Sequence, residues 1–212
     1  MKKLLILALF VIGLILPANA NILPNSTKYL SNSTIGMYQI PKHFVVYAKP
    51  DDKSKILYEA SWDYKSFKAS NGDEYNLFAV LIPQKELAFV QAVDFTEDWV
   101  QIIYNQNSNK TGWIKSEEFR FMLLRNFYNL YGRKYGLYLF NDINKNIKEL
   151  HSATSDESQI VGSLINPQQI KLTAIKGNWA LVTALDSGNV GKTGYIKWRN
   201  ESGEIYLFPA IK

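Results

Sequence analysis

The sequence predicts an all-β protein in which two small β-barrels, each of about five strands, follow a signal peptide. Three observations support this fold class. The hexapeptide KTGWIK at 110–115 returns as KTGYIK at 192–197. Short β-branched and aromatic runs bounded by Asn, Asp, Gly or Pro fill the chain. No window of eleven or more residues shows a persuasive helical periodicity.

Residues 1–20 have the features of a signal peptide. Two lysines form its positive region, residues 4–16 are apolar, and an Ala-x-Ala box ends at Ala20. The alternative is an uncleaved membrane anchor, but a spanning helix needs about 20 apolar residues, and here Pro17 follows a shorter run. We therefore expect a mature chain that begins at Asn21 and is periplasmic or secreted.

Composition narrows the possible partners. Cysteine is absent, which excludes disulfides, thiolate metal sites and a cysteine nucleophile. The mature chain has 22 basic and 19 acidic residues, and its longest basic run is the pair Arg133 and Lys134. We expect no nucleic-acid binding and, after signal cleavage, no stable membrane insertion.

The internal repeat extends beyond the hexapeptide. Four further blocks recur in the same order: GMYQI (36–40) with GLYLF (136–140), VYAKPDDKSKIL (46–57) with LHSATSDESQIV (150–161), DWVQIIY (98–104) with NWALVTA (178–184), and FRFMLL (119–124) with EIYLFPAI (204–211). We place domain one at 36–124, a linker at 125–135 and domain two at 136–212. Residues 21–35 are rich in Asn and Ser and lie outside the repeat, which predicts a poorly packed, disordered lead-in.

The first copy of the repeat is longer than the second. The spacing between matching residues falls from 104 in the second block to 80 at the tryptophans, which locates an insertion between Tyr58 and Lys85. Turn-forming residues in KASNGD (68–73) predict a hairpin or an elaborated loop there. The best helical candidate is 116–132, with Ser116 as N-cap, but the repeat assigns its middle to a strand, and we follow the repeat.

These blocks resemble the bacterial SH3-like (SH3b) domain family. Domain two matches its pattern through SATSDESQIVGSL (152–164), NWALV (178–182) and TGYI (193–196), and domain one through AKPDDKSKIL (48–57), DWVQI (98–102) and TGWI (111–114). Domain one departs from the pattern at its insertion and lacks a counterpart of Gly162. The resemblance implies two SH3-like barrels and, because such domains often accompany cell-wall hydrolases, binding to peptidoglycan or its cross-bridges.

The tryptophan strand and the hexapeptide strand are expected to form a hairpin in each copy. The predicted pairs are Tyr104 with Lys110, Gln101 with Trp113, Ala184 with Lys192, and Leu181 with Tyr195. In this arrangement the hexapeptide glycine permits a close turn into the strand. The following aromatic residue covers the outer face, and Ile114 or Ile196 fills the core.

Six residues are candidates for ligand binding. Trp179 with Tyr195, and Trp99 with Trp113, can form flat platforms for a glycan ring or a peptide, while Asp156 and Glu157 can receive an amine. The alternatives, which a small barrel favours, are that loops or the neighbouring barrel cover the aromatics and that the acids belong to a solvated turn.

We expect no enzyme activity, cofactor or metal site. The sequence has no H-E-x-x-H, no Gly-x-Ser-x-Gly and no phosphate-binding loop. A glycosidase carboxylate pair needs no fixed spacing, but most acids here lie in turn-like stretches. The expected function is that of a secreted, non-catalytic envelope protein that binds peptidoglycan or a wall-associated partner. The alternative is a protein–protein interaction module that modulates a secreted enzyme.

Overall fold

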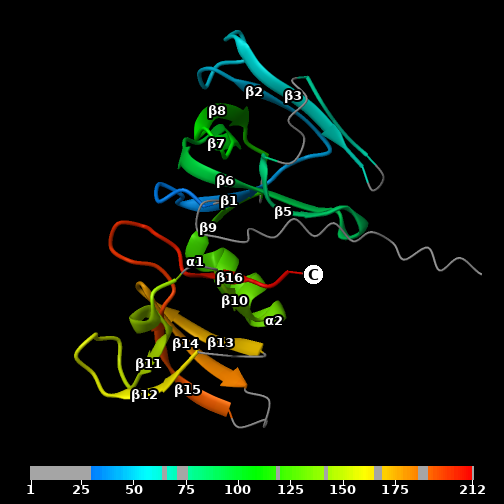
Figure 1. Ribbon diagram of the computed structural model, residues 1–212. Helices are drawn as coiled ribbons and strands as arrows, with labels where there is room; N and C mark the ends of the chain where they lie inside the picture. The colour runs from blue at the N-terminus through cyan, green and yellow to red at the C-terminus, as the bar shows by residue number, and fades with distance from the viewer. Residues whose placement is uncertain are drawn as a thin grey trace, which may run out of the picture.

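A computed structural model describes residues 30–63, 66–70, 76–117, 120–140, 143–164, 169–185 and 191–211. The predicted signal peptide and the start of the mature chain lie outside these residues. Two antiparallel β-sheets with one helical segment between them make up most of the described chain, which confirms the all-β class (Figure 1). In this part of the chain, no helix has the length and apolarity of a membrane span.

The first sheet runs in the order β4-β3-β2-β8-β7-β6-β1-β9, and β5 pairs with β6 off this path. Its strands are β1 (Gly36–Gln39), β2 (His43–Tyr47), β3 (Ile56–Trp62), β4 (Phe67–Ala69), β5 (Phe78–Ile82), β6 (Leu87–Phe95), β7 (Trp99–Asn105), β8 (Lys110–Lys115) and β9 (Phe121–Leu123). A short 3-10 turn, η2 (Pro83–Lys85), joins β5 to β6.

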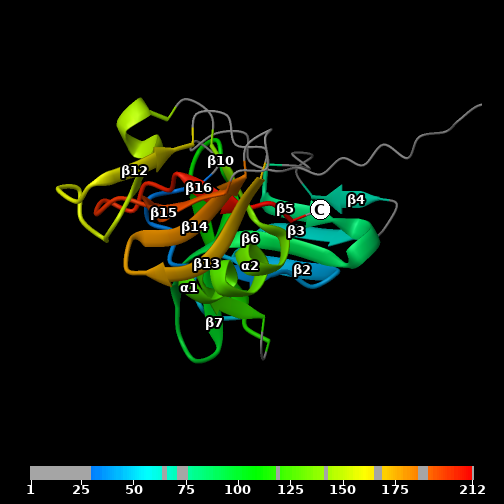
Figure 2. The ribbon, with the colours of Figure 1, turned by 90° about the horizontal axis from the view of Figure 1, so that it is seen from below.

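The second sheet runs in the order β12-β11-β15-β14-β13-β10-β16. Its strands are β10 (Leu137–Leu139), β11 (Glu149–His151), β12 (Ile160–Ser163), β13 (Gln169–Lys176), β14 (Trp179–Leu185), β15 (Gly191–Lys197) and β16 (Leu207–Pro209). The 3-10 turn η4 (Lys145–Lys148) precedes β11. β12 lies at the periphery of the molecule in two perpendicular views (Figures 1 and 2).

The sequence repeat is also a repeat of topology. When β4 and β5 are set aside, the strands of each half follow the same spatial order, namely third, second, sixth, fifth, fourth, first and seventh along the chain. Both β4 and β5 fall within the predicted insertion, and each pairs with the neighbouring strand of the repeat. The pairings among the described residues leave both sheets open, because they do not join the end strands to one another.

The predicted hairpin registers are correct at three of four pairs. Gln101 pairs with Trp113, and Ala184 and Leu181 pair with their predicted partners Lys192 and Tyr195. The pairing of Tyr104 with Lys110 is wrong: Lys110 pairs with Asn105, because the register shifts between Ile103 and Asn105.

The hexapeptide glycines lie within strands and do not form the expected close turn. A Cβ atom on Gly112 would lie 2.5 Å from Val46 Cγ1 and 3.0 Å from the Tyr47 carbonyl oxygen. On Gly194 it would lie 2.9 Å from Leu150 Cβ and 3.0 Å from the His151 carbonyl oxygen. Glycine is therefore required because the neighbouring strand, β2 or β11, crosses too closely for any side chain.

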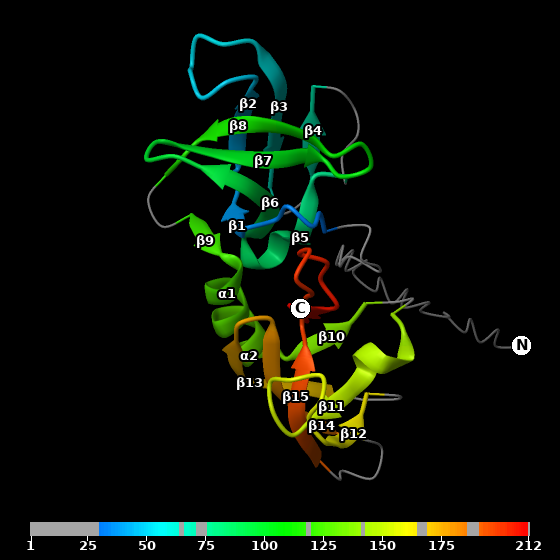
Figure 3. The same cartoon turned by 90° about the vertical axis from the view of Figure 1, so that its left-hand side faces the viewer.

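The expectation that no long window is helical is wrong for the residues assigned to the linker. The chain is helical through α1 (Leu124–Phe127), the π-helix η3 (Tyr128–Gly132) and α2 (Arg133–Tyr135). Figure 3 shows these turns between the two sheets. Three side chains of this helical segment, Leu124, Phe127 and Tyr128, are buried in a core cluster that includes Met37 and Phe89 of the first half and many residues of the second.

Leu30 and Thr34, which the sequence places in a disordered lead-in, are buried, whereas Asn32 and Ser33 between them are exposed. Leu30 is buried in the shared core cluster. The side-chain oxygen of Gln91 accepts hydrogen bonds from the Ser31 N–H (2.6 Å) and the Thr34 hydroxyl (2.8 Å). Residues 21–29 lie outside the described chain.

Candidate functional site

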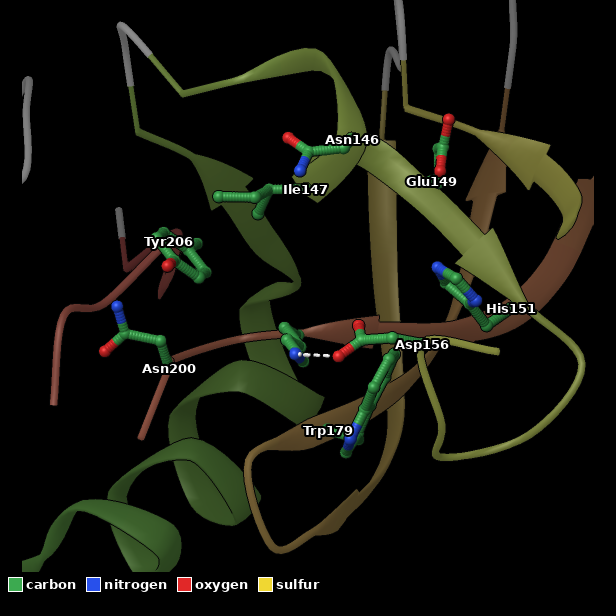
Figure 4. Close-up of a pocket in the computed structure, with 9 residues that line it drawn as sticks. Asn146, Ile147, Glu149, His151, Asp156, Trp179, Asn200 and Tyr206 are labelled. Atoms are coloured by element: carbon green, nitrogen blue, oxygen red, sulfur yellow. Dashed lines mark hydrogen bonds and ion pairs between the residues drawn. The ribbon is translucent and has the colours of Figure 1, made fainter. Parts of the chain in front are cut away.

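A groove of about 400 Å³ opens at the rim of the second sheet (Figure 4). Four segments line it: η4, the strand β11 with its following loop, the β14–β15 hairpin, and the stretch after β15. The lining residues are Asn146, Ile147, Glu149, His151, Asp156, Trp179, Lys197, Asn200 and Tyr206.

Two rings pack together along one side of the groove. The imidazole of His151 lies edge-on to the indole of Trp179, with centroids 5.4 Å apart and planes at 75°. His151 ends β11, and Trp179 begins β14. Trp179 is only 9% exposed, and its remaining surface contributes to the groove.

The β11–β12 loop holds Asp156 at the groove. Ser158 Oγ fixes this loop, because it lies 3.2 Å from the Ala153 carbonyl oxygen and 2.8 Å from that of Ser155. It also accepts a hydrogen bond from the Ala153 N–H at 3.3 Å. Asp156 Oδ2 lies 2.5 Å from Lys197 Nζ, and Figure 4 shows this ion pair as a dashed line within the groove.

The charges of the groove lining are unequal. Lys197 Nζ is paired with Asp156 and lies 5.3 Å from the centre of the Trp179 ring. Glu149 also lines the groove, and it forms no side-chain hydrogen bond or ion pair with any described residue. The lining residues therefore include two carboxylates and one ammonium group.

The opposite side of the groove presents Tyr206 and Asn200. Both are linked to Glu204, whose Oε2 accepts from Asn200 Nδ2 at 3.0 Å and from the Tyr206 hydroxyl at 3.3 Å. Burial, followed by the nearby Glu204 carboxylate, raises the pKa of Tyr206. Its phenol is therefore neutral at ordinary pH and can donate or accept hydrogen bonds.

Only two of the six predicted residues, Asp156 and Trp179, line this groove. Glu157 is exposed on the same loop and accepts a hydrogen bond from Ser155 Oγ at 2.5 Å. Tyr195 is half-buried and accepts a hydrogen bond from Lys176 Nζ at 3.0 Å.

The two predicted residues of the first half, Trp99 and Trp113, belong to an equivalent framework. Trp99 packs edge-on against Tyr47 with centroids 5.6 Å apart, as Trp179 packs against His151. Trp113 is half-buried and pairs with Gln101 and Tyr47. Lys115 Nζ lies 3.9 Å from Asp52 Oδ2, and this pair is a looser counterpart of the Lys197–Asp156 pair in the second half.

The sequence did not identify Glu149, His151, Lys197 and Tyr206 as site residues. Lys197 was detectable in principle, because the hexapeptide ends in lysine in both copies and each lysine faces an acid of the repeated loop. Among the described residues, no group of three or more His, Asp or Glu side chains is placed to hold a metal ion.

Comparison with known proteins adds no family assignment. No protein-family model matches the chain, and no curated protein is similar to it at a significant level.

Proposed function

We propose that this protein is a secreted, non-catalytic binding protein of the bacterial envelope, and that the groove of domain two is its ligand site. The observation that carries the proposal is the composition of the groove. Aromatic rings of Trp179 and Tyr206 line it together with carboxylates and the amides of Asn146 and Asn200. Apolar faces with a few polar groups suit a ligand that is part ring or chain and part hydrogen-bonding group.

We assign each half to an SH3-like module. Two features support the assignment: the sequence resemblance to the SH3b family, and a strand order that occurs twice in the chain. The resemblance to the SH3b family implies binding to the cell wall, so we propose peptidoglycan or a wall-associated protein as the partner. Secretion to the periplasm or exterior rests on the signal-peptide features of residues 1–20.

A catalytic role fits the groove less well. A glycosidase general acid needs a desolvated carboxyl group with a raised pKa. Asp156 is exposed to solvent and paired with Lys197, so it is not a desolvated carboxyl group. We therefore propose binding without turnover, and no cofactor.

The second candidate function is a protein–protein interaction module that modulates a secreted enzyme. One observation favours it: large apolar side chains are exposed at matching positions of the two halves. Ile56 is 52% exposed and Ile160 is 53% exposed, and Val161 beside the latter is 42% exposed. Exposed apolar surface of this kind is common where proteins meet.

Co-sedimentation of the mature chain with purified sacculi tests the proposal. Trp179→Ala is the test variant, and Trp99→Ala is its matched control, because both indoles are 9% exposed at equivalent positions. We expect wild type and Trp99→Ala to pellet and Trp179→Ala to remain largely in the supernatant. If wild type stays soluble at low and moderate salt, wall binding is wrong, and a pull-down from envelope extract tests the second candidate.

A further inference from the structure

The Lys197 ammonium occupies a position that a ligand cation could also take. Its Nζ lies 2.5 Å from Asp156 Oδ2 and 5.3 Å from the centre of the Trp179 ring. A carboxylate together with the face of an indole is a favourable environment for an ammonium group, because both offer negative potential. The groove thus holds a primary ammonium that belongs to the protein itself.

The Lys197 ammonium is held weakly enough to be replaced. The Asp156 side chain is 66% exposed and the Lys197 side chain 26% exposed. Exposed ion pairs of this kind contribute about 0–1 kcal/mol, and lysine has a long, flexible stem that can turn towards water.

Charge decides which kind of ligand the groove attracts. Lys197 is already neutralised by Asp156, and Glu149 adds a carboxylate without a partner among the described residues. A ligand carboxylate would therefore meet an excess of negative charge, whereas a ligand ammonium would balance it.

We infer that the groove binds a ligand through a primary ammonium group and that Lys197 is a tethered competitor for the same position. This inference rests on the proposed function, because it takes the groove as the ligand site. The ligand chemistry is that of a peptide amine or an amino sugar. Domain one lacks the full arrangement, because its Lys115–Asp52 pair is looser and Val45 occupies the strand position equivalent to Glu149.

The test uses the indole N–H signals of the ¹⁵N-labelled mature chain. The protein has five tryptophans, so the other four report on the fold while Trp179, assigned with Trp179→Phe, reports on the groove. The probe is Nα-acetyl-lysine methylamide, which carries one primary ammonium, and its Nε-acetylated analogue is the neutral control. Glucosamine and N-acetylglucosamine form the amino-sugar pair.

We expect an amine probe to shift the Trp179 signal and its acetylated partner to leave the signal in place. The probe pair that responds identifies the peptide or the sugar source. Lys197→Met should tighten probe binding by about twofold to fivefold, because a competitor of this strength is removed. Lys115→Met, the matched control in domain one, should leave the affinity unchanged.

Equal binding of the acetylated probes would overturn the inference, and so would weaker binding by Lys197→Met while its other indole signals remain in place. The sacculus-binding test and the ammonium-probe test can fail independently. If sacculi bind the protein but neither amine shifts Trp179, the ammonium site is wrong and the proposed function stands. If the amine shifts Trp179 but sacculi do not bind, the ammonium site stands and peptidoglycan is wrong.

Discussion

The ring of Phe89 in β6 lies edge-on to the ring of Phe127 in the helical segment, with centroids 5.2 Å apart and planes at 73°. The ring of Tyr131 lies at the same centroid distance from Phe89. These rings connect the first sheet to the helical segment, which itself packs on the second sheet through contacts such as that between Phe127 and Phe208. The two halves therefore share apolar core, and any ligand that contacts both halves meets them at a fixed spacing.

Replacement of Phe89 by alanine should destabilise both halves at once. Removing a buried aromatic ring costs about 3–5 kcal/mol of unfolding free energy, because the transfer term and a cavity add. We expect a single unfolding transition in denaturant for wild type and for Phe89→Ala, followed by circular dichroism and by tryptophan fluorescence. Phe95→Ala, at a ring that is 51% exposed, is the control and should cost about 1 kcal/mol or less. Two separate transitions in wild type would show that the halves unfold independently.

The close crossing of β11 over β15 predicts a specific cost for Gly194→Ala. The new Cβ would lie 2.9 Å from both Leu150 Cβ and Val161 Cγ2, so the strands must separate. Overpacking of this kind costs about 1–3 kcal/mol, measured as the change in the free energy of unfolding. Gly162→Ala is the control, because its Cβ would meet only side-chain atoms at 3.2 Å or more. Equal stability of the two variants would contradict the crossing.

Buried tyrosines make the protein sensitive to alkaline pH. Burial raises the pKa of Tyr128 well above its usual value of about 10, with a smaller effect from Tyr138. The pKa of Tyr128 is higher in the folded state than in the unfolded state, so the neutral phenol contributes to the free energy of unfolding. This contribution is complete below pH of about 10 and is lost as pH rises further, by about 1.4 kcal/mol per pH unit.

Tyr128→Phe should therefore reduce the alkaline loss of unfolding free energy between about pH 10 and about pH 11. The variant also removes the hydrogen bond that the Tyr128 hydroxyl donates to the Leu207 carbonyl oxygen, so its stability at neutral pH should fall by about 0.5–1.5 kcal/mol. Phe127→Leu disturbs the same core without removing a phenol and should keep the wild-type pH slope. An unchanged slope in Tyr128→Phe would show that this phenol does not govern the alkaline limit.

Much of the fold was predictable because equivalent residues of the two copies have the same packing or hydrogen-bonding role. Gly112 and Gly194 face the same strand crossing, and Ser54 closes its loop on Lys49 as Ser158 closes on Ala153. The helical segment was missed for a physical reason. It follows directly on β9 without a polar cap: its N-cap is Leu123, which makes no side-chain capping bond. An apolar run therefore continues from strand into helix with no boundary signal.

The groove was less predictable than the fold. Asp156 and Trp179 lie in repeated blocks whose residue types already indicate binding. Glu149 and Tyr206 lie far apart in the sequence, and only the pairing of β11 with β15 and the return of the chain after β15 bring their segments to one groove. No spacing rule relates such residues in a single sequence.

The loop that carries Asp156 provides a final prediction. Ser158→Ala removes hydrogen bonds that close the loop on Ala153. The free energy needed to open the loop should fall by about 1 kcal/mol, which corresponds to a roughly fivefold rise in the hydrogen-exchange rate of the Ala153 amide. Asp156 then loses its fixed position, so we expect weaker retention on sacculi, since ordering the loop now opposes binding.

Ser54→Ala is the matched control, because Ser54 makes the equivalent bonds to Lys49 in domain one. It should raise exchange at the Lys49 amide by a similar factor and leave sacculus binding unchanged. If both variants weaken binding equally, the ligand contacts both halves, and the fixed spacing set by Phe89 and Phe127 becomes part of the recognition. If neither variant weakens binding while hydrogen exchange rises in both, the loop hydrogen bonds serve only the structure, and Asp156 does not contact the ligand.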